Sequence, residues 1–174
     1  PTLLAGAKLL KQQLPDVQFA MPRAGTIPLT MLQEKIAASG LDVKITEGHN
    51  YDLFSAADLA LATSGTVTLE AALCGLPSVI VYRTSALNAF IARLVINIPN
   101  IGLPNIVAGK TIMPELLQED FTPEKLAKTA VELLQPERQA QLQSDLEYMK
   151  KRLGEPGAVD RVAQLILKLT EEKK

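Results

Sequence analysis

The chain has 174 residues, a length that suits one domain with a buried core of its own. Eighteen Lys and Arg residues against nineteen Asp and Glu residues give a net charge of -1, and there is no Trp. Neither a basic field nor an aromatic base-stacking platform is therefore expected, which argues against nucleic acid as a partner. Cys74 is the single cysteine, so an internal disulfide is excluded and a reducing, cytoplasmic compartment is expected.

Helical patterns alternate with short apolar runs over the first part of the chain. Helices are expected at residues 3–14, 28–39, 51–57 and 67–74. Strands are expected at residues 17–21, 41–45, 58–63 and 78–82. Because these strands are apolar throughout and are separated by helices, they predict an α/β fold with a Rossmann-like parallel sheet covered by helices on both faces.

The pattern changes after residue 82. We expect an apolar helix at 85–95, an irregular segment at 99–105 and a helix opened by Pro114. Thr122 is expected to cap a further helix, with Pro123 at its first position. An extra helical C-terminal segment is expected at about 137–153 and 158–174. The chain opens on Pro1 directly in a helical pattern, and one strand of a Rossmann half is lacking before it. We therefore expect a single domain over residues 1–174 that is truncated at its N-terminus.

A Ser-Gly-Thr corner follows the strand expected at 58–63 and precedes a helix. In an open parallel sheet, ligands bind beyond the carboxyl ends of the strands. Gly65 would let a ligand approach the backbone, the free N–H groups of the helix favour phosphate, and Ser64 and Thr66 add hydroxyl donors. Glu70, one turn beyond Thr66, could accept hydrogen bonds from two sugar hydroxyls. The alternatives are that Ser64 only caps the helix and that Glu70 is a solvated surface residue, although Val67 stands where a capping box would place Glu or Gln.

A second candidate site lies in LPNIVAGK and MPELLQ, from Leu103 to Gln118. The amide of Asn105 can both donate and accept hydrogen bonds. On a helix opened by Pro114, Glu115 and Gln118 would share one face near the positive end. A loop Asn and an exposed helix face are the alternative explanation of the same residues.

The remaining chemistry-bearing residues give weaker signals. His49 is the only histidine and is interpreted as a loop residue, and Cys74 as a packed core thiol. No set of Cys, His and carboxylates has metal-ligand spacing, so no metal or other cofactor is expected. The apolar stretch at 85–105 is too broken by Pro and Asn to span a membrane, and it suggests either burial or contact with lipid.

The chain resembles the lipid-A-disaccharide synthase family in two blocks, SGTVTLEAALCGLPSVIVYR and LPNIVAGKTIMPELLQ. The similarity extends from LLKQQLPDVQF to the helix after FTPEKL. Many glycosyltransferases of the two-Rossmann (GT-B) fold share the Ser-Gly corner with its downstream Glu, and the second block narrows the resemblance to this family. It implies that the chain is the C-terminal, nucleotide-sugar-binding half of a GT-B enzyme.

The resemblance also implies a reaction. The family transfers a diacylglucosaminyl group from UDP-2,3-diacylglucosamine to 2,3-diacylglucosamine 1-phosphate, with inversion and without a metal, in lipid A and lipopolysaccharide biosynthesis. Ser64, Gly65 and Thr66 would then bind the diphosphate, Glu70 the ribose, and the polar trio of the second block (Asn105, Glu115 and Gln118) the donor sugar and phosphates. The backbone at 45–47 would face uracil. The catalytic residue and the lipid acceptor site would belong to an N-terminal half that is absent here. The enzyme would lie at the inner face of the cytoplasmic membrane, in peripheral contact with it.

Two departures from the family pattern matter. A Gly-Ser-Arg loop is expected just before the first helix and is absent, so one phosphate contact is lost. The entire acceptor half is absent too, and we therefore expect the isolated chain to be inactive. Two alternatives stay open: the donor half of another UDP-sugar glycosyltransferase or epimerase, against which the second block argues, and a non-catalytic binding module that uses the apolar stretch at 85–105. A homo-oligomer is compatible with all three.

Overall fold

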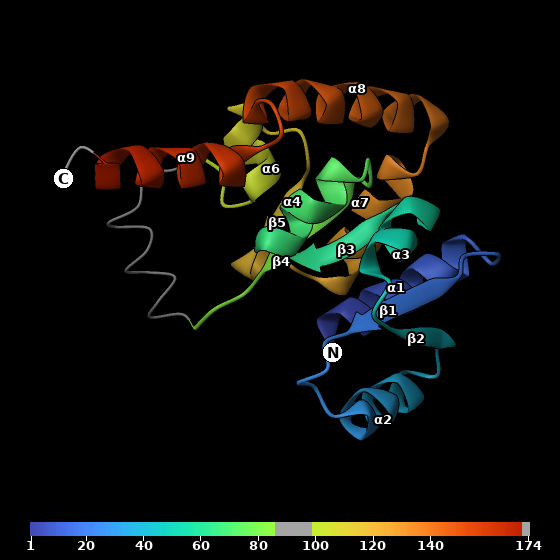
Figure 1. The fold of residues 1–174 in the computed structure, drawn as a ribbon. Helices are drawn as coiled ribbons and strands as arrows, with labels where there is room; N and C mark the ends of the chain where they lie inside the picture. The colour runs from blue at the N-terminus through green and yellow to red at the C-terminus, as the bar shows by residue number, and fades with distance from the viewer. Residues whose placement is uncertain (86–98, 172–174) are drawn as a thin grey trace.

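The computed structural model describes residues 1–85 and 99–171 and has an α/β fold (Figure 1). Its elements in chain order are α1 (Thr2–Gln13), β1 (Phe19–Arg23), α2 (Leu29–Ser39), β2 (Val43–Glu47), α3 (Asn50–Ala56), β3 (Ala60–Thr63), α4 (Thr66–Leu73), β4 (Ser78–Tyr82), α6 (Leu103–Ala108), β5 (Glu115–Leu117), the 3-10 turn η1 (Gln118–Asp120), α7 (Pro123–Leu133), α8 (Pro136–Leu153) and α9 (Ala158–Glu171). The strands form parallel sheets flanked by helices, which confirms the predicted class and is consistent with a Rossmann-like half of a GT-B fold.

Within residues 1–85 and 99–171 all strand pairs are parallel, but the strands form two separate sheets. One sheet has the order β1-β2, with Phe19 opposite Val43. The other has the order β3-β4-β5, with Ala60 opposite Ser78 and Ile80 opposite Glu115. The sequence predicts a single sheet, whereas the described strands form one sheet of β1 and β2 and another of β3, β4 and β5.

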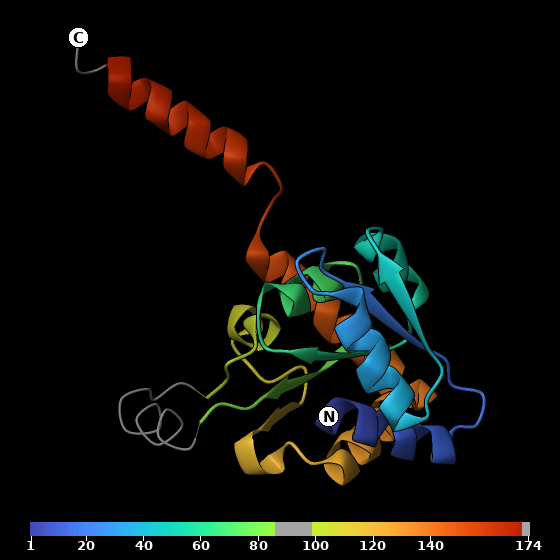
Figure 2. The same ribbon diagram turned by 90° about the horizontal axis from the view of Figure 1, so that it is seen from below.

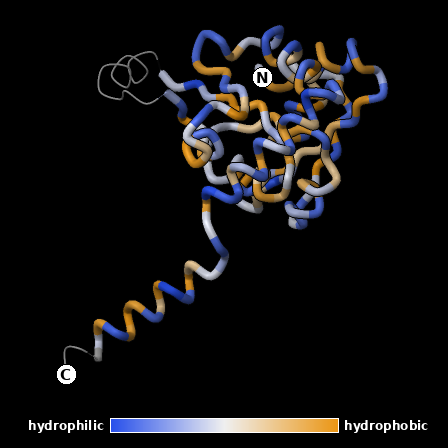
Figure 3. The backbone as a smooth tube through the Cα atoms, turned by 90° about the horizontal axis from the view of Figure 1, so that it is seen from above, coloured by the Kyte–Doolittle hydropathy of each residue, from blue (hydrophilic) through white to orange (hydrophobic). Residues whose placement is uncertain are grey.

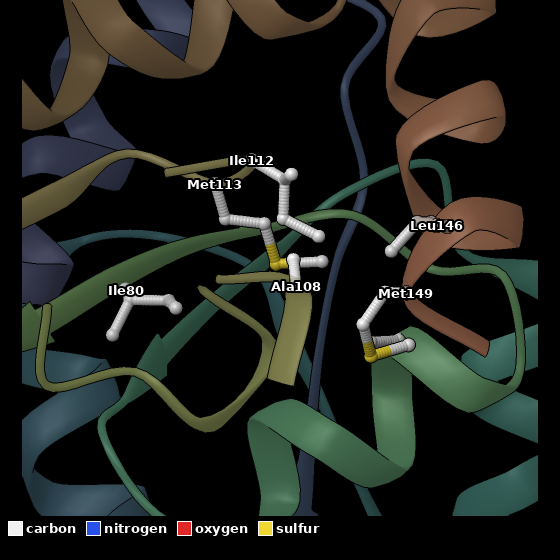
Figure 4. Close-up of a cluster of buried hydrophobic side chains, with 7 residues drawn as sticks. Ile80, Ala108, Ile112, Met113, Leu146 and Met149 are labelled. Atoms are coloured by element: carbon white, nitrogen blue, oxygen red, sulfur yellow. The ribbon is translucent and has the colours of Figure 1, made fainter. Parts of the chain in front are cut away.

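The middle strand β4 is buried on both faces because its alternate side chains enter two different clusters. Ile80 packs with Ala108, Ile112, Met113, Leu146 and Met149 under α4, α6 and α8 (Figure 4). Val79 and Val81 point the other way, into a cluster that includes Leu126, Leu133 and Leu142 of α7 and α8. This two-sided burial is the physical reason that β4 reads as an uninterrupted apolar run.

Most of the predicted elements are present, with their ends shifted by one or two residues. Gly40 ends α2 with φ 71°, the left-handed conformation predicted for a helix-ending glycine. Thr122 caps α7 by accepting a hydrogen bond from the Lys125 N–H at 3.2 Å, and Pro123 follows it as predicted. The apolar helix predicted at 85–95 falls almost entirely outside the described residues.

Two predictions about the second block are wrong. The segment predicted to be irregular, 99–105, becomes helical at Leu103, where α6 begins. Pro104 lies in the first turn of α6, where a backbone N–H would have no helical partner, so proline costs no hydrogen bond there. Pro114 does not open a helix. The next three residues form β5 because they pair with β4, and the Pro114 carbonyl accepts the Ile80 N–H at 2.9 Å. Tertiary pairing here overrides the local preference of Pro for a helix start.

The last helix, α9, extends away from the rest of the described molecule (Figures 2 and 3). Its large apolar residues are exposed, among them Val159, Leu165 and Ile166. Over the described residues, no helix combines the length and apolar character needed to cross a membrane.

Candidate functional site

The Ser-Gly-Thr corner lies at the carboxyl end of β3, between the strand and α4. The Ser64 N–H continues the ladder by donating to the Val81 carbonyl at 3.0 Å. Gly65 follows in an extended conformation, with φ 164°, and α4 begins at Thr66. The strand-to-helix corner is therefore formed where a parallel sheet offers a ligand site.

The hydroxyl of Ser64 does not cap α4. It donates instead to the Ile101 carbonyl at 2.9 Å, and among the described residues no side chain makes a capping hydrogen bond at this helix. The Thr68 hydroxyl donates to the Gly65 carbonyl at 2.7 Å, which holds the corner from inside the helix. The alternative that Ser64 is only a helix cap is therefore wrong. The first N–H groups of α4 have no side-chain acceptor in the described structure, so they can bind an anion.

Gly65, Thr66 and Glu70, the other residues predicted for this site, are all at least partly exposed. A Cβ added at Gly65 would meet no neighbouring protein atom closer than the Thr63 carbonyl oxygen at 4.0 Å, so neither packing nor backbone strain requires glycine there. Thr66 is exposed and Glu70 is half-buried. Within the described part of the chain, the Glu70 carboxylate makes no hydrogen bond or ion pair. Its acceptor capacity is therefore available to a ligand.

Asn105 is fully buried, and protein groups use its whole amide. The side-chain Nδ2 donates to the Met113 carbonyl at 2.8 Å and to Glu115 Oε1 at 2.7 Å. The Oδ1 accepts the N–H groups of Ile112 at 2.8 Å and Met113 at 2.9 Å. Asn105 therefore joins α6 to the start of β5, and its predicted contact with a ligand stays a prediction.

Glu115 organises the loop before α6. Its Oε2 accepts the Ile101 N–H at 2.9 Å, and its Oε1 accepts the Gly102 N–H at 3.0 Å. A Cβ at Gly102 would collide with the end of the Ile80 side chain and lie 3.1 Å from Glu115 Oε1, so a larger residue there would require these side chains to shift. The backbone of Ile101 links the two candidate regions, because its N–H donates to Glu115 and its carbonyl accepts a hydrogen bond from Ser64.

Gln118 lies apart from Asn105, at the carboxyl end of β5. It has a positive φ of 50°, unusual for a residue other than glycine, and its Oε1 accepts the Thr84 N–H at 3.4 Å. Because β4 and β5 are parallel neighbours, this turn lies at the same edge of the sheet as the corner. The structure thus brings Ser64, Asn105 and Glu115 into one hydrogen-bonded network and leaves Gln118 outside that network.

The segment at 45–47, predicted to face uracil, forms the end of β2. Ile45 and Glu47 line a cavity of about 500 Å³ under α2, and Arg23 on β1 pairs with Glu47. The hydrogen bond from Arg23 lowers the pKa of the exposed Glu47 carboxyl below its ordinary value. His49 is exposed, and its Nδ1 lies 3.2 Å from Oδ2 of Asp52 in the first turn of α3. The interpretation of His49 as a loop residue did not include this carboxylate partner.

Sequence reasoning also missed Arg83 and the backbone of the loop at 101–102. Arg83 follows β4 directly and donates to the Gln118 carbonyl at 3.3 Å and to the Phe121 carbonyl, with its guanidinium 5.1 Å from the Phe121 ring centroid. A basic residue immediately after a buried strand is a signal that could have placed a positive charge at this edge. No pattern of side chains could have revealed the role of the loop, because the loop acts through its backbone. No group of three or more metal-ligating side chains occurs in the ranges 1–85 and 99–171.

Comparison with known proteins identifies the family. A family model described as lipid-A-disaccharide synthetase matches residues 1–169. The chain belongs to the lipid-A-disaccharide synthase family. A lipid-A-disaccharide synthase of Syntrophus aciditrophicus is 41% identical over 174 residues, which cover 99% of this chain and 45% of that relative. One of Geobacter sulfurreducens is 36% identical over 170 residues, which cover 97% of this chain and 44% of that relative.

This member of the lipid-A-disaccharide synthase family thus spans about 45% of the length of the curated relatives that it matches. Both the corner and the second block lie inside the matched residues. The family resemblance of the sequence is confirmed. The ligand contacts of the individual side chains stay predictions.

Proposed function

We propose that the chain is the donor-binding part of a lipid-A-disaccharide synthase. The parent enzyme would be an inverting glycosyltransferase that transfers a diacylglucosaminyl group from UDP-2,3-diacylglucosamine to 2,3-diacylglucosamine 1-phosphate. The names of the relatives support this reaction, and the α/β fold with its corner supports the donor role. The acceptor site and the catalytic carboxylate would lie in a second half, so the chain alone would not turn over.

The uncapped start of α4 is the observation that carries the donor role. The diphosphate of UDP would accept hydrogen bonds from the first N–H groups of the helix and lie over Gly65, where the protein leaves space for it. The Thr66 hydroxyl would add a second kind of donor. As the bond to the sugar breaks, negative charge grows on the departing UDP, and fixed N–H dipoles stabilise that charge without a metal.

Glu70 would bind the ribose, and the residues of the second block would act mainly by positioning the corner. The Glu70 carboxylate is free to accept hydrogen bonds from two adjacent hydroxyls, one turn from Thr66. Asn105 and Glu115 hold the loop at 101–102, which in turn holds Ser64. Gln118 would reach the donor from the neighbouring strand end. We place the enzyme at the cytoplasmic face of the membrane, in peripheral contact with its lipid substrates.

Calorimetric titration of the full-length protein with UDP and with pyrophosphate tests the assignment. Glu70→Ala removes a charged acceptor from the ribose, which is worth about 1.5–3 kcal/mol, so UDP should bind about 10- to 100-fold more weakly. Pyrophosphate, which has no ribose, should bind as it does to the unaltered protein. Glu34→Ala is the matched control, since it removes an exposed carboxylate on α2.

Two results would contradict the proposal. Equal losses for UDP and pyrophosphate in Glu70→Ala would remove the ribose role. An absence of saturable UDP binding by the folded, unaltered protein at millimolar concentration would remove the donor site altogether.

A further inference from the structure

The ladder between β4 and β5 ends in an exchange of hydrogen-bond acceptors at Gln118. Within the ladder, the Ile80 N–H donates to the Pro114 carbonyl at 2.9 Å. The same parallel register, continued past the ends of both strands, would bring the Thr84 N–H to the Gln118 carbonyl. The Thr84 N–H donates instead to the side-chain Oε1 of Gln118, at 3.4 Å. The side chain of Gln118 thus takes the place in the ladder that its own backbone carbonyl has left.

The backbone conformation of Gln118 accounts for this exchange. Its φ of 50° is left-handed, a conformation that residues other than glycine rarely adopt and that the surrounding structure must stabilise. The Gln118 carbonyl is directed out of the ladder to Arg83, whose Nη2 donates to it at 3.3 Å. The same Nη2 donates to the Phe121 carbonyl, just after the 3-10 turn η1 that Gln118 begins. Arg83 therefore holds this turn at both of its ends.

Arg83 is itself fixed by two further contacts. Its guanidinium carbon lies 5.1 Å from the centroid of the buried Phe121 ring, and its Nη1 donates to the Thr2 hydroxyl at 3.4 Å. A rigid, planar guanidinium can make such contacts simultaneously, whereas a lysine ammonium on a flexible stem cannot reproduce the fork. The conformation of Gln118 thus depends on the geometry of Arg83 and not only on its charge.

The exchange leaves the other half of the Gln118 amide available. Because Oε1 accepts the Thr84 N–H, the orientation of the planar amide is set, and Nε2 is directed away from Thr84. Within residues 1–85 and 99–171 this Nε2 makes no hydrogen bond, and the residue is only half-buried. A donor that is oriented before the ligand arrives loses less conformational entropy on binding than a freely rotating one.

This oriented donor lies two strands away from the Ser-Gly-Thr corner. Strand β4 separates β3 from β5 and all three are parallel, so Gln118 and the corner lie at the same edge, about 10 Å apart across the sheet (Figure 1). A group attached to the diphosphate, rather than the diphosphate over Gly65 itself, would therefore lie beside Gln118. Since the ribose is assigned to Glu70, the group that remains in the proposed donor is its hexose.

We propose that Arg83 is a positioning residue for the hexose of the donor, because it holds the left-handed turn that fixes the Gln118 Nε2 as a hydrogen-bond donor to a sugar hydroxyl. The inference rests on the proposed donor-binding function and adds a residue to it. Arg83 does not touch the sugar in this arrangement and acts through Gln118.

Steady-state kinetics of the full-length enzyme distinguishes this role from a purely structural one. Arg83→Lys keeps the charge but loses the fork, so kcat/KM for UDP-2,3-diacylglucosamine should fall about tenfold. The inhibition constant of UDP, which has no hexose, should change by less than about threefold. Arg152→Lys is the matched control, since Arg152 donates to the Val107 carbonyl at 2.9 Å and lies 5.9 Å from the Tyr148 ring centroid. It should leave both constants within about threefold of those of the unaltered enzyme.

A double variant tests whether Arg83 acts through Gln118. Glycine adopts a positive φ without strain, so Gln118→Gly removes the side chain but retains the turn, and kcat/KM for the donor should fall about tenfold. Adding Arg83→Lys to Gln118→Gly should then lower kcat/KM by less than about a further threefold. Thermal unfolding of each preparation verifies that the variants are folded.

Three results would overturn the positioning role alone: an unchanged kcat/KM in Arg83→Lys, an equal loss of affinity for UDP, or a second full loss of about tenfold in the double variant. An absence of transfer by the folded, unaltered enzyme would contradict the proposed function and this inference with it.

Discussion

The polar groups at Asn105 and at the Ser-Gly-Thr corner are close neighbours in the fold but differ in how they are satisfied. Asn105 is 0% exposed, and four protein groups bind its amide. At the corner the first N–H groups of α4 have no side-chain cap, and the described structure supplies no partner for the Glu70 carboxylate. Polar groups that are hydrogen-bonded to other protein groups stabilise the fold, so replacing them should lower the free energy of unfolding. Polar groups without a protein partner are available to a ligand, so replacing them should lower the affinity for that ligand.

Ser64 belongs to both regions. Its backbone forms the corner, and its hydroxyl binds the loop that Glu115 holds. The comparison therefore predicts three kinds of variant: those that change stability, those that change binding, and one that changes both.

The largest effect is expected for Asn105→Ala. The change leaves the N–H groups of Ile112 and Met113 and the Met113 carbonyl buried without partners, and it removes a donor from Glu115. Each unsatisfied buried group is worth about 1–3 kcal/mol, so the free energy of unfolding should fall by at least about 3 kcal/mol. Urea unfolding of the full-length protein measures it. Gln33→Ala removes an exposed amide on α2 and should change stability by less than about 0.5 kcal/mol. Equal small losses in the two variants would mean that the Asn105 network is not structural.

Gly65→Ala should weaken ligand binding and leave stability almost unchanged. The extended backbone at Gly65 suits any residue. In the described structure the atom nearest to the added methyl group would be the Thr63 carbonyl oxygen at 4.0 Å, so stability should change by less than about 1 kcal/mol. The methyl group would occupy the space proposed for phosphate, and UDP should bind more than about tenfold more weakly. Calorimetry and thermal unfolding of one preparation test both parts. Gly25→Ala, in a loop with open space around it, should affect neither. Unchanged UDP affinity in Gly65→Ala would move the diphosphate away from the corner.

The sequence predicts the corner well because its determinants are local. An apolar run, a Ser-Gly pair and a helical pattern lie within a few residues of one another, and each constrains the next. The same is true of Thr122 and Pro123, where cap and first turn are adjacent in the chain.

The second block is predicted less well because its structure depends on distant residues. Glu115 lies on a strand rather than a helix because β5 pairs with β4, whose partner residue Ile80 is far away in the sequence. The contact between Ser64 and Ile101 likewise joins residues 37 positions apart. Local patterns contain no information about such pairings, so the sequence named the residues of the block but misassigned their geometry.

Ser64→Ala should have a moderate effect on both properties. It removes one hydrogen bond, to the Ile101 carbonyl, which should lower the free energy of unfolding by about 0.5–1.5 kcal/mol. Since the loop and the corner are then no longer joined, UDP affinity should also fall, though less than in Gly65→Ala. Ser55→Ala is the control, because its hydroxyl binds a backbone carbonyl within exposed α3. A loss of stability without any change in affinity would separate the two regions.

The smallest effect is expected outside both regions, at the ion pair between Lys110 and Asp145. Partial burial would raise the pKa of Asp145, but hydrogen bonds from Lys110, at 2.7 Å, and from Gln141 outweigh it, so the pKa lies below its ordinary value of 3.8. A carboxyl whose pKa is lower in the folded state stabilises that state above the ordinary value, and this stabilisation is lost as the pH falls through the folded value. Because Lys110 is half exposed, Asp145→Asn should lower stability by less than about 1 kcal/mol at pH 7. The difference from the unaltered protein should shrink once the pH falls below 3.8, as measured by urea unfolding across that range. A difference that stays constant with pH would show that the side chain acts by packing rather than by its charge. Ser55→Ala, which removes only a hydrogen bond to the Tyr51 carbonyl, gives the reference curve for such behaviour.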